Sequence, residues 1–226
     1  MDISNKKINF HIHTKYSFDS NLEPTFIVDL LASNGYDIAI ITDHNTIKGA
    51  IEAQNYAKKK YGNKFEVIVG EEVQSDIGDI IGFPVHDEVE PGDYKTVINE
   101  LKKQGAKLCL PHPYKSHNLF IIHDDNFICN FDFIEVFNAR VPIRLDTFAE
   151  ELRTKFKKKG IIGTDAHVKN DLLNCAFVYD NDLNHINVQA KKTSIRNIRK
   201  SQLINSSRQI KLGGICKYTF LYAINK

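Results

Sequence analysis

This sequence of 226 residues has no long uninterrupted apolar stretch, although 42% of its residues are hydrophobic. A helix that crosses a bilayer needs about 20 consecutive apolar residues, so the sequence predicts no membrane span. Residues 1–7 lack the apolar centre of a secretory signal. The four cysteines are scattered, and none has the C-x-x-C spacing of a metal or redox motif. We therefore expect a cytoplasmic protein without a disulfide framework.

The sequence also lacks the signatures of several common enzyme classes. It contains neither a glycine-rich phosphate-binding loop nor the elbow that presents a nucleophilic serine or cysteine. Low-complexity linkers and convincing internal repeats are absent as well. At this length, one α/β domain over residues 1–226 is the most economical interpretation, although two small domains stay open.

Short apolar segments alternate with amphipathic ones, which predicts strands that alternate with helices. The expected strands are 8–13, 36–42, 65–73, 79–83, 107–111, 133–137, 160–164 and 175–179. The expected helices are 24–34, 46–61, 94–104 and 142–159, each followed by a glycine. This alternation is typical of a parallel sheet covered by helices. Periodicity alone does not decide whether such a sheet is open or closed into a barrel.

The C-terminal segment is basic. Of a total net charge of +2, Leu183 to Lys226 contribute nine lysines and arginines and no acidic residue, which leaves the first 182 residues at −7. We expect a helix over 194–205 and a final apolar stretch over 218–224, both as extensions of one domain. The basic segment, about 183–226, can contact phosphates or nucleic acid, but a solvated helical face is an equally good interpretation.

Histidine and carboxylate side chains follow the ends of most expected strands. His11 and His13 are two residues apart, and such positions face the same side of a strand. An isolated pair of this kind is more often structural than metal-binding. The pattern recurs, however, at or near further strand ends: Asp19, Asp43, His44, Glu71, Glu72, His112, Glu135, Asp165 and His167. Because the carboxyl ends of parallel strands gather at one face, we expect these residues to converge.

Imidazole and carboxylate ligands without thiolate suit catalytic Zn²⁺, Mn²⁺ or Fe²⁺ better than a structural zinc site. There are too many candidate ligands for one tetrahedral ion, which favours two or three ions that share a carboxylate. Clustered cations lower the pKa of a shared water and stabilise charge on a phosphoryl group. The residue types therefore favour hydrolysis of phosphate esters.

Five segments resemble, in order, the signature motifs of the PHP family, named for polymerase and histidinol phosphatase. They are residues 11–19, 42–45, 70–72, 111–113 and 163–167, which read HIHTKYSFD, TDHN, GEE, PHP and GTDAH. The motifs are specific as a set, although each alone is not. The resemblance implies a distorted, TIM-like (β/α)7 barrel that holds a di- or trinuclear metal centre at the carboxyl ends of its strands.

The resemblance also implies a set of metal ligands: His11, His13, Asp19, His44, Glu72, Asp79, His112, Asp165 and His167. Glu72 aligns with the bridging glutamate, whereas Glu71 would face the other side of its strand. Asp43 would orient an imidazole rather than bind metal. Asp79 stands where many relatives have a histidine, in the segment GDIIG, so a ligand role and a supporting role are equally open.

Residues 135–140 resemble a segment of the phosphoesterase branch of this family. Arg140 is the best candidate for binding a phosphate, because a guanidinium group binds phosphate in a bidentate manner. Lys115 and Asn138 are further candidate substrate contacts, and Glu135 would support Arg140 or the metal ligands. A hydroxide shared by the ions would attack phosphorus, with Arg140 stabilising the charge. Asp165 or a second metal-bound water would supply the proton for the leaving group.

The predicted function is that of a metal-dependent phosphoesterase, which hydrolyses a small phosphomonoester such as a phosphorylated metabolite or a nucleotide. One alternative is an exonuclease or phosphodiesterase that acts on oligonucleotide ends and uses the basic C-terminal segment. Another is a metal-binding scaffold without turnover. The nearly complete ligand set argues against the scaffold, since a decayed site is expected to lose ligands first. Between residues 88 and 112 only one helix is expected, which leaves no room for a capping subdomain.

Overall fold

The computed structural model describes residues 5–116, 124–179 and 185–212. Its strands are β1 Ile8–Ile12, β2 Ile38–His44, β3 Glu66–Ser75, β4 Gly78–Phe83, β5 Lys107–Leu110, β6 Phe133–Asn138, β7 Lys159–Gly163, β8 Cys175–Tyr179 and β9 His185–Ala190. Its longer helices are α1 Pro24–Ser33, α2 Lys48–Tyr61, α3 Tyr94–Lys103, α6 Ile143–Lys155 and α7 Ile195–Leu212. Shorter helical turns are η1 Gly62–Lys64, α4 Pro113–Ser116, α5 Asp125–Ile128 and η3 Lys169–Asp171. All expected strands and helices are present with shifted ends, whereas β9 was not expected.

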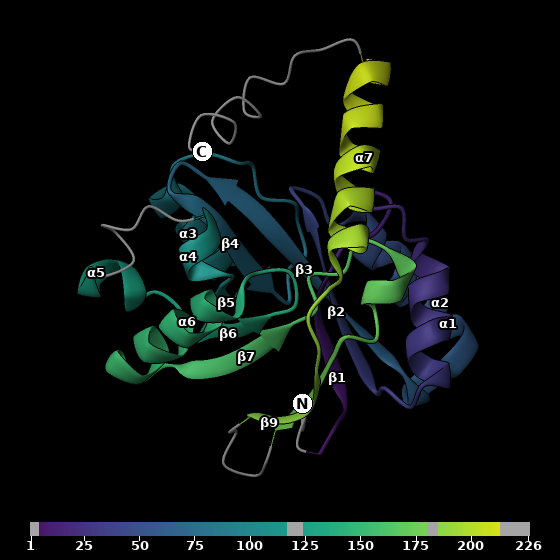
Figure 1. The fold of residues 1–226 in the computed structure, drawn as a ribbon, viewed down its shortest axis with the longest axis horizontal. Helices are drawn as coiled ribbons and strands as arrows, with labels where there is room; N and C mark the ends of the chain where they lie inside the picture. Colours follow the sequence, from purple (N-terminus) through teal and green to yellow (C-terminus); the bar gives the residue numbers. More distant parts are fainter. Residues whose placement is uncertain (1–4, 117–123, 180–184, 213–226) are drawn as a thin grey trace.

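The nine strands form one sheet in the order β7-β6-β5-β4-β3-β2-β1-β8-β9. Strands β1 to β3 run parallel to one another, as do β5 to β7. Just beyond β7, the backbone N–H of Thr164 donates to the carbonyl of Phe10, and that of Ala166 to the carbonyl of His11. The sheet therefore returns to β1 as a nearly closed barrel, with α1, α2, α3 and α6 outside it (Figure 1). This confirms the expected distorted TIM-like barrel.

The expectation of a parallel sheet is wrong for two strands. β4 runs antiparallel to β3 and β5, and β8 runs antiparallel to β1 and β9. Only residues 76–77 separate β3 from β4, and a connection this short permits an antiparallel pair but no crossover. Because β4 is reversed, its beginning, with Asp79, lies beside the carboxyl end of β3.

Aliphatic and aromatic side chains form a continuous buried core, in which Phe10, Ile41 and Ile80 are completely buried. Burying one such side chain stabilises the fold by roughly 1.5–3 kcal/mol. α1 begins at Pro24, whose fixed φ suits the first turn of a helix. α2 buries Ala50, Ala53 and Ala57 against the sheet. The strands that carry the candidate ligands are thus anchored by a continuous core.

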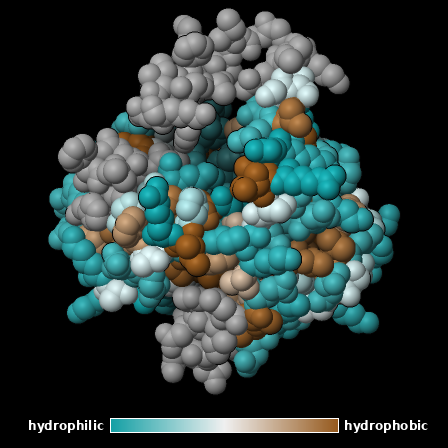
Figure 2. All heavy atoms as spheres, viewed as in Figure 1, coloured by the Kyte–Doolittle hydropathy of each residue, from teal (hydrophilic) through white to brown (hydrophobic). Residues whose placement is uncertain are grey.

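The face seen in Figure 2 is mostly hydrophilic, with hydrophobic side chains scattered over it. Among the described helices, none is long and apolar enough to cross a membrane. Cys109, Cys129 and Cys175 are free thiols. The expected C-terminal helix is confirmed as α7, which continues to Leu212. The expected apolar stretch at 218–224 lies outside the described residues, and the single-domain assignment and the cytoplasmic location stay predictions.

Candidate metal centre

The side chains of His11 and His13 both face the middle of the barrel edge that is formed by the carboxyl ends of the parallel strands. A regular strand would not place them there. The backbone of His11 has a φ of +65°, and the register between β1 and β2 shifts between Phe10 and Ile12. This is a β-bulge, which re-aims side chains locally. His13 lies just beyond the end of β1, and the centroids of the two imidazoles are 5.2 Å apart. The bulge, rather than simple alternation, therefore brings the two rings together.

Two further candidate ligands also have left-handed backbones, His112 at φ +28° and Asp165 at φ +49°. Residues other than glycine are uncommon in this region, and each costs about 1–3 kcal/mol. A neighbouring hydrogen bond restrains His112, whose backbone N–H donates to Glu135 at 2.7 Å. Such strain is concentrated at functional sites.

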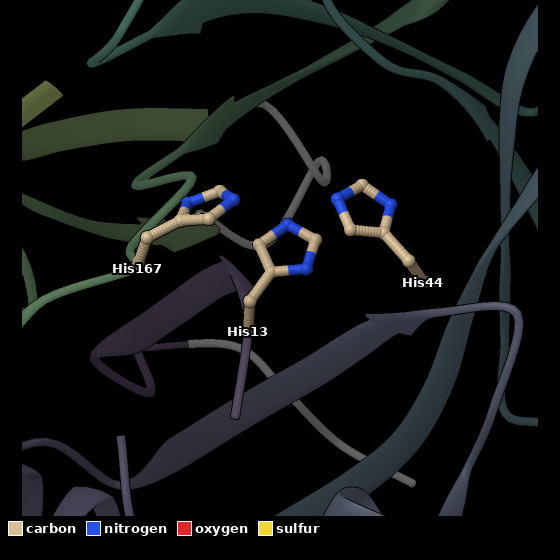
Figure 3. Close-up of side chains that lie close together, drawn as sticks. All are labelled: His13, His44 and His167. Atoms are coloured by element: carbon tan, nitrogen blue, oxygen red, sulfur yellow. The ribbon is translucent and has the colours of Figure 1, made fainter. Parts of the chain in front are cut away.

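Three imidazoles from separate segments meet at this edge (Figure 3). His44 is the last residue of β2, and His167 follows β7. The ring of His13 is 4.4 Å from that of His44 and 4.3 Å from that of His167, measured between centroids. One nitrogen of each ring lies within 4.8 Å of the others, as one shared ion requires. Asp19 faces the same cluster, with Oδ2 2.9 Å from Nε2 of His167.

Glu72 is the central carboxylate. Its Oε2 lies 3.3 Å from Nε2 of His11 and 3.3 Å from Nε2 of His13. The same oxygen lies 3.1 Å from Nδ1 of His44, while Oε1 lies 3.0 Å from Nε2 of His112. Its two oxygens thus face different histidines, which is the placement that a carboxylate shared between ions needs.

Asp79 joins this arrangement from the reversed strand β4. Ligand atoms of Glu72, Asp79 and His112 lie within 4.8 Å of one another, and so do those of His11, His112 and Asp165. The geometry therefore places Asp79 among the candidate ligands. Its role as a ligand stays a prediction.

The chemistry of these side chains fits divalent cations. Among the described residues, Nε2 of His13, Nδ1 of His44 and Oδ1 of Asp19 are buried without a hydrogen-bond partner. An unsatisfied buried polar atom costs about 1–3 kcal/mol, which a bound cation would offset. Burial, together with neighbouring His167 and His44, lowers the pKa of His13 to about 3. The His13 ring is therefore neutral, the form that binds metal.

Two buried carboxylates keep their negative charge. Burial alone would raise the pKa of Glu72, but the nearby rings of His11 and His44 hold it well below its usual range. Burial likewise opposes ionisation of Asp165, but Lys115 and His11 lower its pKa well below its usual range. Both groups are thus in the form that metal ions bind.

Glu135 contacts His11 directly and is linked to Arg140 through Asn138, so the structure agrees with both supporting roles that the sequence left open. Its Oε1 lies 2.8 Å from Nδ1 of His11, so the other ring nitrogen faces Glu72. Its Oε2 accepts from the amide of Asn138 at 2.9 Å. The amide oxygen of Asn138 in turn accepts from the backbone N–H of Arg140. Asn138 is thus used within the protein, and a substrate contact by this residue stays a prediction.

Asp43 holds the turn that follows β1. It accepts from the backbone N–H of Thr14 at 2.6 Å and from the hydroxyl of Ser17 at 2.6 Å. The Ser17 hydroxyl also lies 3.2 Å from Nδ1 of His13 and accepts from the N–H of His44. Asp43 therefore orients His13 through Ser17, in agreement with its predicted supporting role. Ser17 belongs to the first family motif, but sequence reasoning assigned it no role, because the sequence does not show the partners of a serine in a loop.

Lys115 and Arg140 bring positive charge to the same edge. Nζ of Lys115 lies 3.3 Å from Oδ2 of Asp165, and Nε of Arg140 lies 4.0 Å from the same oxygen. The effect of burial on Lys115 is outweighed by Asp165 and Glu72, which raise its pKa. Both predicted phosphate contacts thus lie beside the candidate ligands, although their role in binding substrate stays a prediction.

Two further residues complete the surroundings. Phe18, which sequence reasoning missed, is partly exposed, and its ring is stacked on that of His44 with 4.7 Å between centroids. Glu71 points away from the centre and accepts from the N–H of Val89 at 3.0 Å, as its position next to Glu72 predicted. Burial raises the pKa of Glu71 to about 7.

Comparisons with known proteins agree with this geometry. A family model for the PHP domain matches residues 9–201. An uncharacterized protein of Methanocaldococcus jannaschii is 35% identical over 144 residues, which cover 59% of this chain and 82% of that protein.

Solved structures share the fold at low sequence identity. A two-domain protein from Bacteroides vulgatus, which contains a predicted PHP-like metal-dependent phosphoesterase, has a TM-score of 0.62 at 20% identity. The alignment covers 90% of this chain but only 63% of that protein. An amidohydrolase from Chromobacterium violaceum, solved with sulfate and no metal, has a TM-score of 0.61 at 13% identity, with 87% and 96% of the two chains covered. At these identities the likeness shows the fold alone.

Proposed function

Because the PHP domain model matches residues 9–201, this chain belongs to the PHP domain family, and from this premise we propose that it is a metal-dependent phosphoesterase acting on small phosphomonoesters. The observation that carries the proposal is one cluster of imidazoles and carboxylates with two positively charged side chains beside it. Lys115 and Arg140 both approach Asp165, which also lies within 3.8 Å of His11. Positive groups next to a metal-binding cluster suit a substrate with a phosphate group.

Two or three divalent ions would be held by three overlapping sets of residues. These are His13, His44 and His167 with Asp19; His11, His13 and Glu72 with Asp165; and Glu72, Asp79 and His112. Imidazole and carboxylate ligands fit Mn²⁺, Fe²⁺ or Zn²⁺. When bound, such ions activate a water for attack and stabilise negative charge on the phosphoryl group.

The chain's own residues would bind and orient the substrate. The guanidinium group of Arg140 can bind two phosphate oxygens at once, whereas the flexible Lys115 supplies a point charge. Asp165 lies between these two basic side chains and the histidines, so we assign it a part in catalysis. Glu135 and Asp43 keep His11 and His13 in fixed orientations, which avoids reorganisation during the reaction.

Hydrolysis of oligonucleotide ends is the second candidate. One observation favours it: Arg196, Arg199 and Lys200 are exposed on α7, the helix next to Arg140. Basic side chains on one helix can bind a nucleic-acid backbone.

One screen tests both candidates. The purified protein would be loaded separately with Mn²⁺, Fe²⁺ and Zn²⁺, and the metal counted by mass spectrometry. Each form would be assayed on nucleoside and sugar monophosphates, on bis(p-nitrophenyl) phosphate and on 5′-phosphorylated oligonucleotides. We expect the monophosphates to be hydrolysed fastest. Preference for oligonucleotides would favour the second candidate, and bound metal without any hydrolysis would indicate the scaffold.

A further inference from the structure

Helix α7 lies with one face against the edge of the barrel that carries the candidate ligands. Its inward positions recur every three or four residues: Asn197, Ile198, Ser201, Ile204, Asn205 and Arg208. This spacing places them on one side of the helix. Figure 1 shows α7 standing over the upper end of the strands. The basic residues Arg196, Arg199 and Lys200 are on the exposed side, so they do not explain why the helix is seated there.

The inward face contacts Arg140 directly. Nη2 of Arg140 donates to the hydroxyl of Ser201 at 2.6 Å, and Ser201 is only 2% exposed. The same hydroxyl donates to the carbonyl of Ile198 at 2.9 Å, so both of its hydrogen-bonding functions are in use. The hydroxyl is thereby fixed as an acceptor for the arginine.

A second contact holds the other side of the guanidinium group. Nη1 of Arg140 lies 3.4 Å from Oδ2 of the buried Asp171. Oδ1 of Asp171 accepts from the side chain of Asn197 at 2.9 Å. Asn197 and Ser201 are one helical turn apart, so α7 restrains Arg140 both directly and through Asp171.

These contacts leave the guanidinium group able to bind an anion. An arginine side chain carries five N–H donors, of which Ser201 and Asp171 use one on each terminal nitrogen. A free arginine side chain loses rotamer entropy when it binds an anion, and restraint before binding removes part of that cost. Anchoring by α7 therefore favours tight binding of a phosphate.

We propose that Ser201 is a positioning residue, which holds Arg140 in the orientation that binds the substrate phosphate and so makes α7 part of the active site. The inference rests on the proposed function. Ser201 acts through Arg140 and does not touch the substrate.

The test compares Ser201→Ala with a matched serine on the same helix. Ser207 is exposed, and its hydroxyl bonds only to the carbonyl of Leu203 among the described residues, so Ser207→Ala is the control. In the full-length, Mn²⁺-loaded protein we expect S201A to raise the KM for a phosphomonoester about 5- to 10-fold, because the loosened Arg140 side chain would lose more rotamer entropy on binding. The dissociation constant for inorganic phosphate, measured by calorimetry, should rise equally. The kcat and metal content should stay at the wild-type level, and Ser201→Thr should restore KM.

A double-mutant cycle shows whether the effect passes through Arg140. In the Arg140→Ala background, S201A should cause no further change in KM or phosphate affinity. Asn197→Ala is a second variant that loosens Asp171 without altering Ser201, and it should also weaken phosphate binding. Unchanged phosphate affinity in both S201A and N197A, or equal losses with and without Arg140, would overturn the inference. If R140A itself leaves KM and phosphate affinity unchanged, the phosphate contact in the proposed function is wrong as well.

Discussion

Replacing Gly163 by alanine should disturb the candidate metal centre without changing any candidate ligand. A Cβ atom at this position would lie 1.7 Å from Oε1 of Glu135 and 3.1 Å from Cβ of His11. Oε1 is the oxygen that lies 2.8 Å from Nδ1 of His11. The Glu135 side chain is not free to move away, because its other carboxylate oxygen accepts hydrogen bonds from the backbone N–H of His112 and from the side-chain amide of Asn138. The added methyl group would therefore displace the carboxylate that orients His11.

Two effects of different size follow. Overpacking a buried site costs about 1–3 kcal/mol of stability. In a protein of this length each kcal/mol lowers Tm by about 2–4 °C, so we expect Tm to fall by roughly 2–12 °C. Loss of a group that orients a metal-binding histidine weakens metal affinity about 10- to 100-fold, and we expect Mn²⁺ affinity to fall by this factor.

The two effects are measured separately. Thermal unfolding in excess chelator reports stability without metal, and Mn²⁺ titration reports affinity. Gly92→Ala is the matched control, because nothing lies within 4 Å of a Cβ atom placed there. In Glu135→Ala/Gly163→Ala the clash is gone, so the double variant should lose less stability than the sum of the single variants. If G163A unfolded and bound Mn²⁺ like G92A, the close packing of Gly163 on Glu135 would be refuted.

Three other outcomes are expected. His13→Ala and Asp165→Ala should each abolish phosphate release while the far-UV circular dichroism spectrum keeps its native shape, and full activity in either variant would contradict the assigned site. Arg140→Ala should raise KM for a phosphomonoester more than Lys115→Ala, because the Lys115 side chain is 41% exposed and that of Arg140 only 9%; lost metal with an unchanged KM would contradict a phosphate contact. Mn²⁺ at 100 times its dissociation constant should stabilise the chelator-treated protein by about 2.7 kcal/mol, and an unchanged Tm would argue against a folded-state metal site.

The order of strands and helices could be predicted because apolar segments and glycines mark it clearly. The direction of β4 was missed for a local reason. Sequence pattern ends the third strand at Val73 and begins the next at Asp79, whereas pairing continues through Ser75 and Gly78. Gln74 and Ser75 extend β3 and Gly78 extends β4, and these non-apolar residues conceal how short the turn is. β9 was missed because it is an edge strand, which within the described ranges pairs with β8 alone.

The residues of the site could largely be predicted because parallel strands bring their carboxyl ends together. The exact orientation of their side chains could not be predicted. The left-handed backbones of His11, His112 and Asp165 depend on tertiary contacts, which a local sequence pattern does not show. The bond between Arg140 and Ser201 spans 61 residues, and that between Ser17 and Asp43 spans 26. A single sequence does not show which residues so far apart along the chain are in contact.

The structure divides the two tasks of the proposed phosphoesterase between different parts of the chain. The candidate ligands belong to the barrel strands and the segments next to them, where Glu135 and Asp43 fix the orientation of His11 and His13. Arg140, the proposed phosphate contact, is instead restrained by α7. A change in α7 would therefore alter the affinity for substrate while leaving the metal ligands in place. Loops and appended segments commonly adjust specificity on a rigid scaffold in this way, so substrate preference is expected to follow α7 rather than the barrel.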